Sequence, residues 1–219
     1  MLFLTLDKKG VFAAAVIAIL LLIFGKNYGL FLLALLFVFL VLSAIVTDIN
    51  KRKKKRIGLY EKSRGWKNVL ANGIIPLFIA VVYFFYSNYA GNIILLGYIA
   101  SIAAITADKF ASEIGVLDGK PIMLLTLKRV EKGISGGVTP LGLAASAFAS
   151  FIISLGSFYI SASMLVFFII LISGFLGNIV DSLLGYYEEK GYGNKFTTNI
   201  ACALSGFIFA LLFFALAGI

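Results

Sequence analysis

Residues 30–56 read LFLLALLFVFLVLSAIVTDINKRKKKR, an uncharged apolar run that is followed within five residues by the basic stretch 51–56. The chain as a whole is also strongly apolar: 61% of its 219 residues are apolar and only 13% are charged. A soluble domain has about 45–50% apolar and about 25% charged residues. A chain this short could not bury such an excess in a water-facing globule. The composition therefore predicts a single integral membrane domain over residues 1–219.

Seven apolar runs predict an all-α fold, a polytopic membrane helical bundle with about seven transmembrane helices. The runs are continuous and lack the period-two alternation of membrane β-strands. Several are near 15 residues, about 22 Å as helix, so we expect them to extend into their polar flanks to cross a core of roughly 30 Å. No small-residue cleavage site follows the first run, which we therefore keep as a helix. The runs are 11–24, 30–46, 69–86, 93–107, 141–160, 164–184 and 200–216.

The distribution of charge predicts the orientation. Basic loops favour the cytosol, so the stretch 51–56 places the N-terminus and the 108–138 and 186–198 connections on the cytosolic side. Only Lys26 of the nineteen basic residues then lies outside, and all ten acidic residues lie inside or at inner helix ends. We interpret the basic stretch as a topogenic signal that also attracts anionic lipid. A nucleic-acid-binding arm is disfavoured because no aromatic residues are interleaved.

The residue types present limit the chemistry. The chain has no histidine, which excludes Ser-His-Asp hydrolysis and most zinc or copper sites. Cys202 is the lone cysteine, so no internal disulfide or thiolate cluster can form. Carboxylates, amides, hydroxyls, glycine backbone and cations remain, and these groups suit Mg²⁺ and phosphate.

Two carboxylates lie at the inner end of the fourth run. Asp108 and Glu113 are costly at a membrane boundary unless they are paired, hydrated or bound to metal. Their spacing places them about 140° apart on a regular helix, so one metal ion can take both only if the helix breaks. Lys109, four residues before Glu113, offers a simple ion pair instead. Both interpretations remain open from the sequence.

A polar stripe crosses the sixth run. Gly174, Asn178, Asp181 and Gly185 follow steps of four, three and four, which align them on one helical face. Glycines allow a neighbouring backbone or a ligand to approach closely. Asp181 lies about two turns from the expected inner membrane boundary, where a bare carboxylate is hard to keep ionised. Interhelical packing through one hydrogen bond is the alternative to a functional site.

Three connecting segments complete the inner face. In GISGGVTPLG at 133–142, Thr139 and Pro140 predict the start of the fifth helix, and the glycines before it could offer N–H groups to phosphate. A flexible turn has the same composition. Arg64, Asn68 and Asn72 follow steps of four across the start of the third run. Thr198 or Asn199 is expected to cap the last helix.

At these residues the sequence resembles the membrane family that includes the plant phytyl-phosphate kinase and transmembrane protein nineteen, known as domain of unknown function ninety-two. The resemblance covers about residues 60–219, leaving two N-terminal helices and the basic loop at 1–59. This chain has Lys109-Phe110 where members often have Thr-Trp. The matching stretches are RGWKNVLANG at 64–73, ADKFASEIG at 107–115, GISGGVTPLG at 133–142, GFLGNIVDSLLG at 174–185 and FTTN at 196–199.

The resemblance implies a Mg²⁺-dependent kinase that transfers phosphate from a nucleoside triphosphate, CTP or ATP, to an isoprenoid monophosphate of the phytyl or geranylgeranyl type. It implies catalytic roles for Asp108, Glu113, Asn178 and Asp181, with the three carboxylates binding metal. It further implies phosphate contacts from Arg64, Lys128, Ser135, Gly136 and Gly137, and a site lined by Asn68, Asn72 and Asn199.

Two other functions also fit the sequence. A cation or small-solute transporter could use Asp181 in a helical pathway. Against it, the halves of the chain show no clear inverted repeat, and the charges gather on one side. Another CTP-dependent polyprenol or lipid nucleotidyl or phosphoryl transferase would share the metal, the nucleotide and the lipid.

Overall fold

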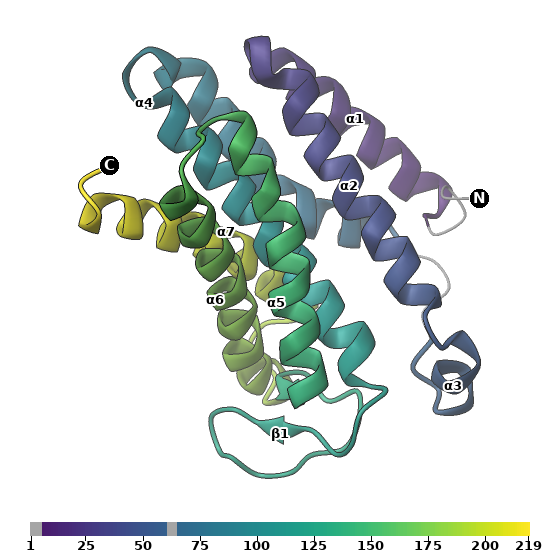
Figure 1. Ribbon diagram of the computed structural model, residues 1–219. Coiled ribbons are helices and arrows are strands. Elements are labelled where there is room, and N and C mark those ends of the chain that lie inside the picture. The colour runs from purple at the N-terminus through teal and green to yellow at the C-terminus, as the bar shows by residue number, and fades with distance from the viewer. Residues whose placement is uncertain (1–5, 61–64) are drawn as a thin grey trace.

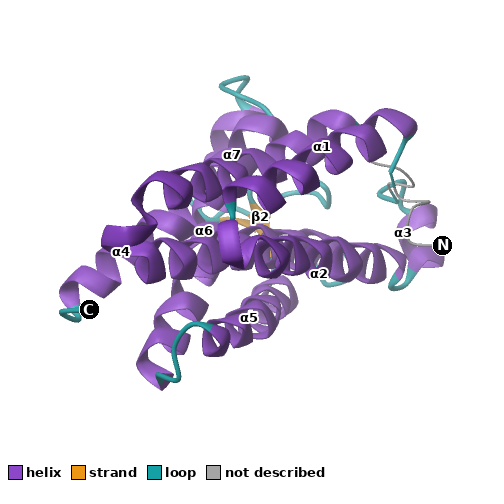
Figure 2. Cartoon of the chain, turned by 90° about the horizontal axis from the view of Figure 1, so that it is seen from above, coloured by secondary structure: helices purple, strands orange, loops and turns teal. Residues whose placement is uncertain are grey.

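Helices make up most of the computed structural model, which describes residues 6–60 and 65–219 (Figure 1). Two-residue strands β1 (Ile122–Met123) and β2 (Gly137–Val138) pair antiparallel in the longest connection. Figure 2 shows how small this strand element is beside the helices. The all-α prediction is confirmed. The helices are α1 (Lys8–Phe24), α2 (Gly29–Asp48), α3 (Lys51–Arg56), α4 (Trp66–Gly115), α5 (Pro140–Ser154), α6 (Met164–Glu189) and α7 (Lys195–Leu216), with 3₁₀ turns η2 (Lys26–Tyr28) and η3 (Leu155–Tyr159).

All seven predicted runs lie in helical segments, and the fifth continues from α5 into η3. Among the described residues, five helical segments are long and apolar enough to cross a membrane, and the 50-residue α4 counts once among them. Ala90 interrupts α4 with non-helical φ and ψ of −140° and 28°, between the third and fourth runs. The first run lies in α1, whose 17 residues make it shorter than these five segments.

The two parts of α4 run in opposite directions on either side of Ala90. Before the bend, Phe84 packs edge-on against Phe24 at the end of α1, with ring centroids 5.5 Å apart. After the bend, the Tyr98 hydroxyl donates to the Leu32 carbonyl near the start of α2 at 2.8 Å. Figure 1 shows the ribbon turning back at this point. Both ends of α4 therefore return to the side where α2 ends.

Small residues allow α6 and α7 to pack closely on the second part of α4. A Cβ added at Gly177 would lie 2.6 Å from the Ala104 Cβ and 2.9 Å from the Cys202 carbonyl oxygen. A Cβ at Gly206 would lie 2.7 Å from the Ala100 carbonyl oxygen. Such contacts are typical of helix packing in membranes, where close van der Waals approach replaces the hydrophobic effect. They bring the polar faces of α4, α6 and α7 together.

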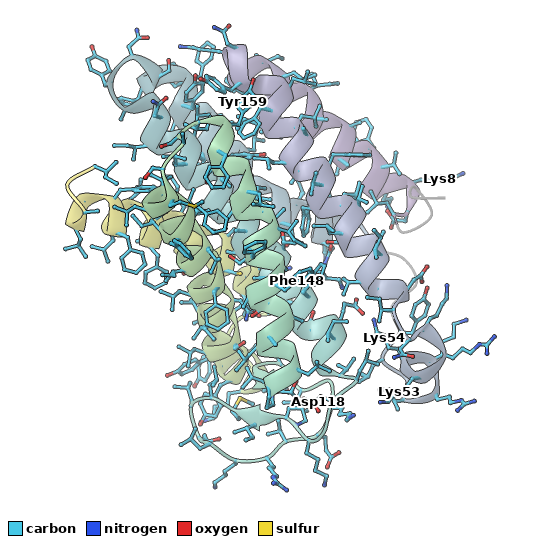
Figure 3. The ribbon with its side chains drawn as sticks, viewed as in Figure 1. Lys8, Lys53, Lys54, Asp118, Phe148 and Tyr159 are labelled. Atoms are coloured by element: carbon cyan, nitrogen blue, oxygen red, sulfur yellow. The ribbon has the colours of Figure 1, made fainter. Side chains whose placement is uncertain are left out.

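Most of the charged side chains gather at one end of the bundle, which we call the charged end. It comprises α3, the 116–139 connection and the start of α7. Figure 3 shows Lys53, Lys54 and Asp118 at this end and Tyr159 at the opposite end, with Phe148 between them. Large apolar side chains such as Phe12 and Leu30 are exposed along the bundle, as expected where lipid is the solvent.

Candidate active site

Two buried carboxylates share one lysine at the charged end. Asp108 on α4 and Asp181 on α6 are 8% and 5% exposed. The Lys195 ammonium, at the start of α7, donates to Asp181 Oδ2 at 3.0 Å and lies 3.8 Å from Asp108 Oδ1. Three helices distant in sequence thus meet at one charge cluster. We call Asp108 and Asp181 the acidic pair.

Several buried polar atoms of α6 and α7 have no hydrogen-bond partner among the described residues. They include both amide atoms of Asn178, Asp181 Oδ1 and Asn199 Oδ1. Asn178 is 1% exposed and lies one turn before Asp181 on the same face of α6. An unpaired buried polar atom costs about 1–3 kcal/mol, so such atoms in one place call for a ligand.

A cavity of about 260 Å³ opens beside these groups. The acidic pair, Asn178 and Lys195 contribute to one part of its wall, and the turn at residues 135–137, here called the glycine turn, contributes to another. The cavity therefore joins carboxylates, an amide, an ammonium and backbone groups. These are the components that a phosphate and its metal ion need.

The glycine turn rests directly on α6. Gly136 has φ of +79°, in the left-handed region, and a Cβ there would lie 2.5 Å from the Ser182 carbonyl oxygen. The backbone N–H of Ser135 donates to a Glu189 carboxylate oxygen at 2.8 Å. A backbone donor of the glycine turn thus already binds an anionic group.

Replacing Gly136 with alanine should therefore damage the site. The left-handed backbone disfavours a side chain, and the added methyl group meets the α6 backbone, so we expect a loss of about 1–3 kcal/mol in unfolding free energy. Gly119→Ala is the matched control, because a Cβ there meets nothing within 4 Å. Thermal unfolding in detergent compares the two variants. Equal stabilities would contradict the observed packing.

Asp118 anchors the connection to the start of α5. Its carboxylate accepts hydrogen bonds from the backbone N–H groups of Gly119, at 2.8 Å, and Leu141, at 3.1 Å. These bonds hold the pKa of the Asp118 carboxyl below its usual range. The predicted cap is also confirmed, since Thr139 Oγ1 accepts from the Gly142 N–H at 3.1 Å, with Pro140 in the first turn.

The last helix begins earlier than the sequence indicated. Asn194, not Thr198 or Asn199, is the N-cap of α7, and Asn194 and Thr197 form a reciprocal capping box. This shift places Lys195 in the first turn and Asn199 one turn further along the same face. Lys195 was therefore missed as a candidate residue. The asparagine followed three residues later by a hydroxyl is the signal that could have located the helix start.

Glu113 lies in a second charged cluster. It accepts from Lys54 Nζ at 2.7 Å, from Thr47 Oγ1 at 3.0 Å, and from Lys109. Because α4 stays helical through Gly115, Glu113 points away from Asp108, and no three acidic, histidine or cysteine side chains converge among the described residues. The structure therefore does not bring Glu113 together with Asp108 and Asp181, the other two carboxylates that were expected to bind metal.

The same cluster binds part of the basic stretch to the bundle. Lys54 is fully buried and also donates to the carbonyl oxygens of Val46, at 2.8 Å, and Thr47, at 3.0 Å, at the end of α2. Lys53 donates to the Leu117 carbonyl at 2.7 Å, just beyond α4. The stretch 51–56 therefore joins α2 to α4, a structural role that its sequence did not indicate.

Other predicted residues lie away from the acidic pair. Asn68 and Asn72 line a separate, mainly apolar cavity of about 310 Å³ between α1, α2 and the first part of α4. The Asn72 side chain donates to the Asn68 carbonyl at 2.8 Å. Lys128 is exposed on the connection, away from the residues that line the cavity beside the acidic pair. Arg64 lies outside the described residues.

Fold and site together define a polytopic helical membrane protein with a polar, carboxylate-bearing cavity at the charged end of its bundle. The chain belongs to the family described as integral membrane protein DUF92, whose model matches residues 2–203. The predicted family is thus confirmed, and the match also includes α1 and α2, which the motif resemblance left out. No solved structure matches the chain.

Three relatives illustrate the family. An uncharacterized membrane protein of Methanocaldococcus jannaschii is 36% identical over 95% of this chain and 86% of its own length. Protein PGR of Arabidopsis thaliana is 29% identical over 83% of this chain and 71% of its own length. An uncharacterized membrane protein of Synechocystis sp. is 33% identical over 46% of this chain and 40% of its own length.

Proposed function

We propose that this protein is a membrane kinase that transfers the γ-phosphoryl group of a nucleoside triphosphate to an isoprenoid monophosphate, giving the diphosphate. The proposal rests on one observation: the acidic pair and Asn178, whose amide has no partner among the described residues, line one cavity with a lysine and the glycine turn. Following the positive-inside rule, we propose that the charged end faces the cytosol, where nucleotides are available.

The residues of the site fit Mg²⁺. This ion usually takes one or two protein carboxylates, and substrate phosphates and water complete its octahedron. The acidic pair would supply the carboxylates, and Asn178 would supply an amide oxygen that has no partner within the described chain. When bound, Mg²⁺ would neutralise charge that develops on the phosphate oxygens during transfer.

The chain's own groups would position the phosphates. The Lys195 ammonium brings positive charge to the cavity, and the Ser135 N–H, which donates to Glu189, is a backbone donor that a phosphate oxygen could take over. Both act on oxygens that gain negative charge in the transition state, the main requirement for phosphoryl transfer. No strong general base is needed, because a lipid phosphate is already ionised at neutral pH.

The proposed reaction is balanced. An oxygen of the isoprenoid phosphate forms a bond to the γ-phosphorus, and the bond from that phosphorus to the β,γ-bridging oxygen breaks. The nucleoside diphosphate leaves with the electron pair. The cavity lies at the end of an apolar bundle, so the lipid phosphate could enter it while the isoprenoid tail stays in the bilayer.

The test uses purified protein in detergent with Mg²⁺, geranylgeranyl or phytyl monophosphate, and each of ATP, CTP, GTP and UTP in turn. We expect lipid diphosphate, detected by mass spectrometry, with at least one nucleotide, and none when EDTA removes the metal. Absence of product with every pair, from protein that remains folded, would contradict the kinase.

A further inference from the structure

Lys195 occupies a position that the helix itself disfavours. It is the first residue of α7, where the helix carries partial positive charge, and cations are unfavourable there. Its ammonium contacts Asp181 Oδ2 at 3.0 Å and lies 3.8 Å from Asp108 Oδ1. The carboxylates of the acidic pair, which come from two other helices, offset the unfavourable interaction of this lysine with the helix start.

One ammonium does not satisfy the groups around it. The acidic pair carries two negative charges when ionised, and Lys195 supplies one positive charge. Asp181 Oδ1, Asn178 Oδ1 and Asn199 Oδ1 still have no hydrogen-bond partner among the described residues. A divalent cation would by itself balance the two carboxylate charges and would bind oxygen atoms of this kind.

The lysine side chain can move without loss of the helix start. Its side chain is 48% exposed and lines the cavity, whereas the carboxylates that it contacts are almost fully buried. The side chains of Asn194 and Thr197, not that of Lys195, cap α7. A lysine also carries its charge on a flexible four-carbon stem. The ammonium can therefore turn from the acidic pair toward the cavity.

We propose that Lys195 is an exchangeable counter-ion of the acidic pair: a divalent metal ion displaces its ammonium from the carboxylates, and the ammonium then binds phosphate in the same cavity. The inference rests on the proposed function, from which the metal and the phosphate are taken. In this role Lys195 opposes binding of metal alone and favours binding of metal together with phosphate. The site would thus bind the metal ion together with the nucleotide, not the metal ion alone.

Direct binding of Mn²⁺ to the full-length protein, measured by calorimetry in lipid nanodiscs, tests this exchange without any turnover. We expect Lys195→Met to bind Mn²⁺ about tenfold more tightly than the parent, because a competing cation next to the carboxylates is lost. Lys195→Arg should behave like the parent. Lys190→Met is the matched control, since that lysine is exposed and contacts the Tyr186 ring instead.

Pyrophosphate provides the second measurement. Adding it should tighten Mn²⁺ binding to the parent, and the gain should be about tenfold smaller in Lys195→Met, which lacks the phosphate-binding charge. Lys195→Gln makes the same comparison if the methionine variant does not fold.

Each other outcome overturns the exchange. Equal or weaker Mn²⁺ binding by folded Lys195→Met would show that Lys195 stays bound to the acidic pair and has a structural role only. Absence of Mn²⁺ binding by the parent would show that the acidic pair is not a metal site. A negative kinase assay is a separate result. It would remove the proposed reaction, whereas tighter Mn²⁺ binding by Lys195→Met would still establish the exchange.

Discussion

Asp181→Asn should lower phosphoryl transfer by about a hundredfold to a thousandfold, the range seen when one preorganised charge-stabilising group is removed. Asp181 is buried in α6, contacts Lys195 at 3.0 Å and keeps its second oxygen without a partner among the described residues. Asparagine keeps the shape of the side chain and removes its charge. The metal ion would then have only the Asp108 carboxylate of the acidic pair to bind. Initial rates of lipid diphosphate formation, at saturating nucleotide, measure the loss.

Glu131→Gln is the matched control for this substitution. Glu131 also lies near a lysine, with 3.7 Å between its carboxylate and Lys120 Nζ, but both side chains are largely exposed and do not line the cavity. We expect its rate to equal that of the parent. If Asp181→Asn retains the parental rate while folded, the acidic pair does not perform the chemistry.

Lys54→Met should lower the unfolding free energy by roughly 3 kcal/mol, as expected when one partner of a buried ion pair is removed. The Lys54 side chain is fully buried, and its ammonium donates to Glu113 and to the two carbonyl groups at the end of α2. Methionine fills similar volume but supplies none of these hydrogen bonds. Urea or thermal unfolding in detergent gives the comparison.

Two further variants make this prediction specific. Lys55→Met changes the neighbouring residue of α3, which is exposed and lies 5.5 Å from the Tyr60 ring, and should change stability little. The double variant Lys54→Met with Glu113→Leu should lose less than the sum of its single variants, because both single variants remove the same Lys54–Glu113 ion pair. Additive losses would show that the two side chains are not coupled.

Features set by local pattern could be predicted from the sequence. The seven apolar runs lie in helices because hydrophobicity and length decide which segments cross a bilayer. The Thr139-Pro140 helix start depends on neighbouring residues alone. Gly174, Asn178, Asp181 and Gly185 are all buried on α6, since helical periodicity places them on one face.

Features set by tertiary contact could not be predicted in this way. Burial of Lys54 depends on where Glu113 lies after α4 has bent at Ala90 and returned, which no local pattern gives. Asn68 and Asn72 lie in a stretch that resembles the family but face α1 and α2. Lys195 was overlooked because the apolar run starts at residue 200, whereas the capping box starts α7 five residues earlier.

The most direct test follows heavy oxygen from the nucleotide into the lipid. The protein is incubated with Mg²⁺, an isoprenoid monophosphate and the preferred nucleotide, whose γ-phosphate non-bridging oxygens are oxygen-18. We expect lipid diphosphate that carries the label in its terminal phosphate, because the γ-phosphoryl group itself is transferred. An unlabelled diphosphate, or a nucleotidyl-lipid in place of the diphosphate, would contradict phosphoryl transfer at the acidic pair.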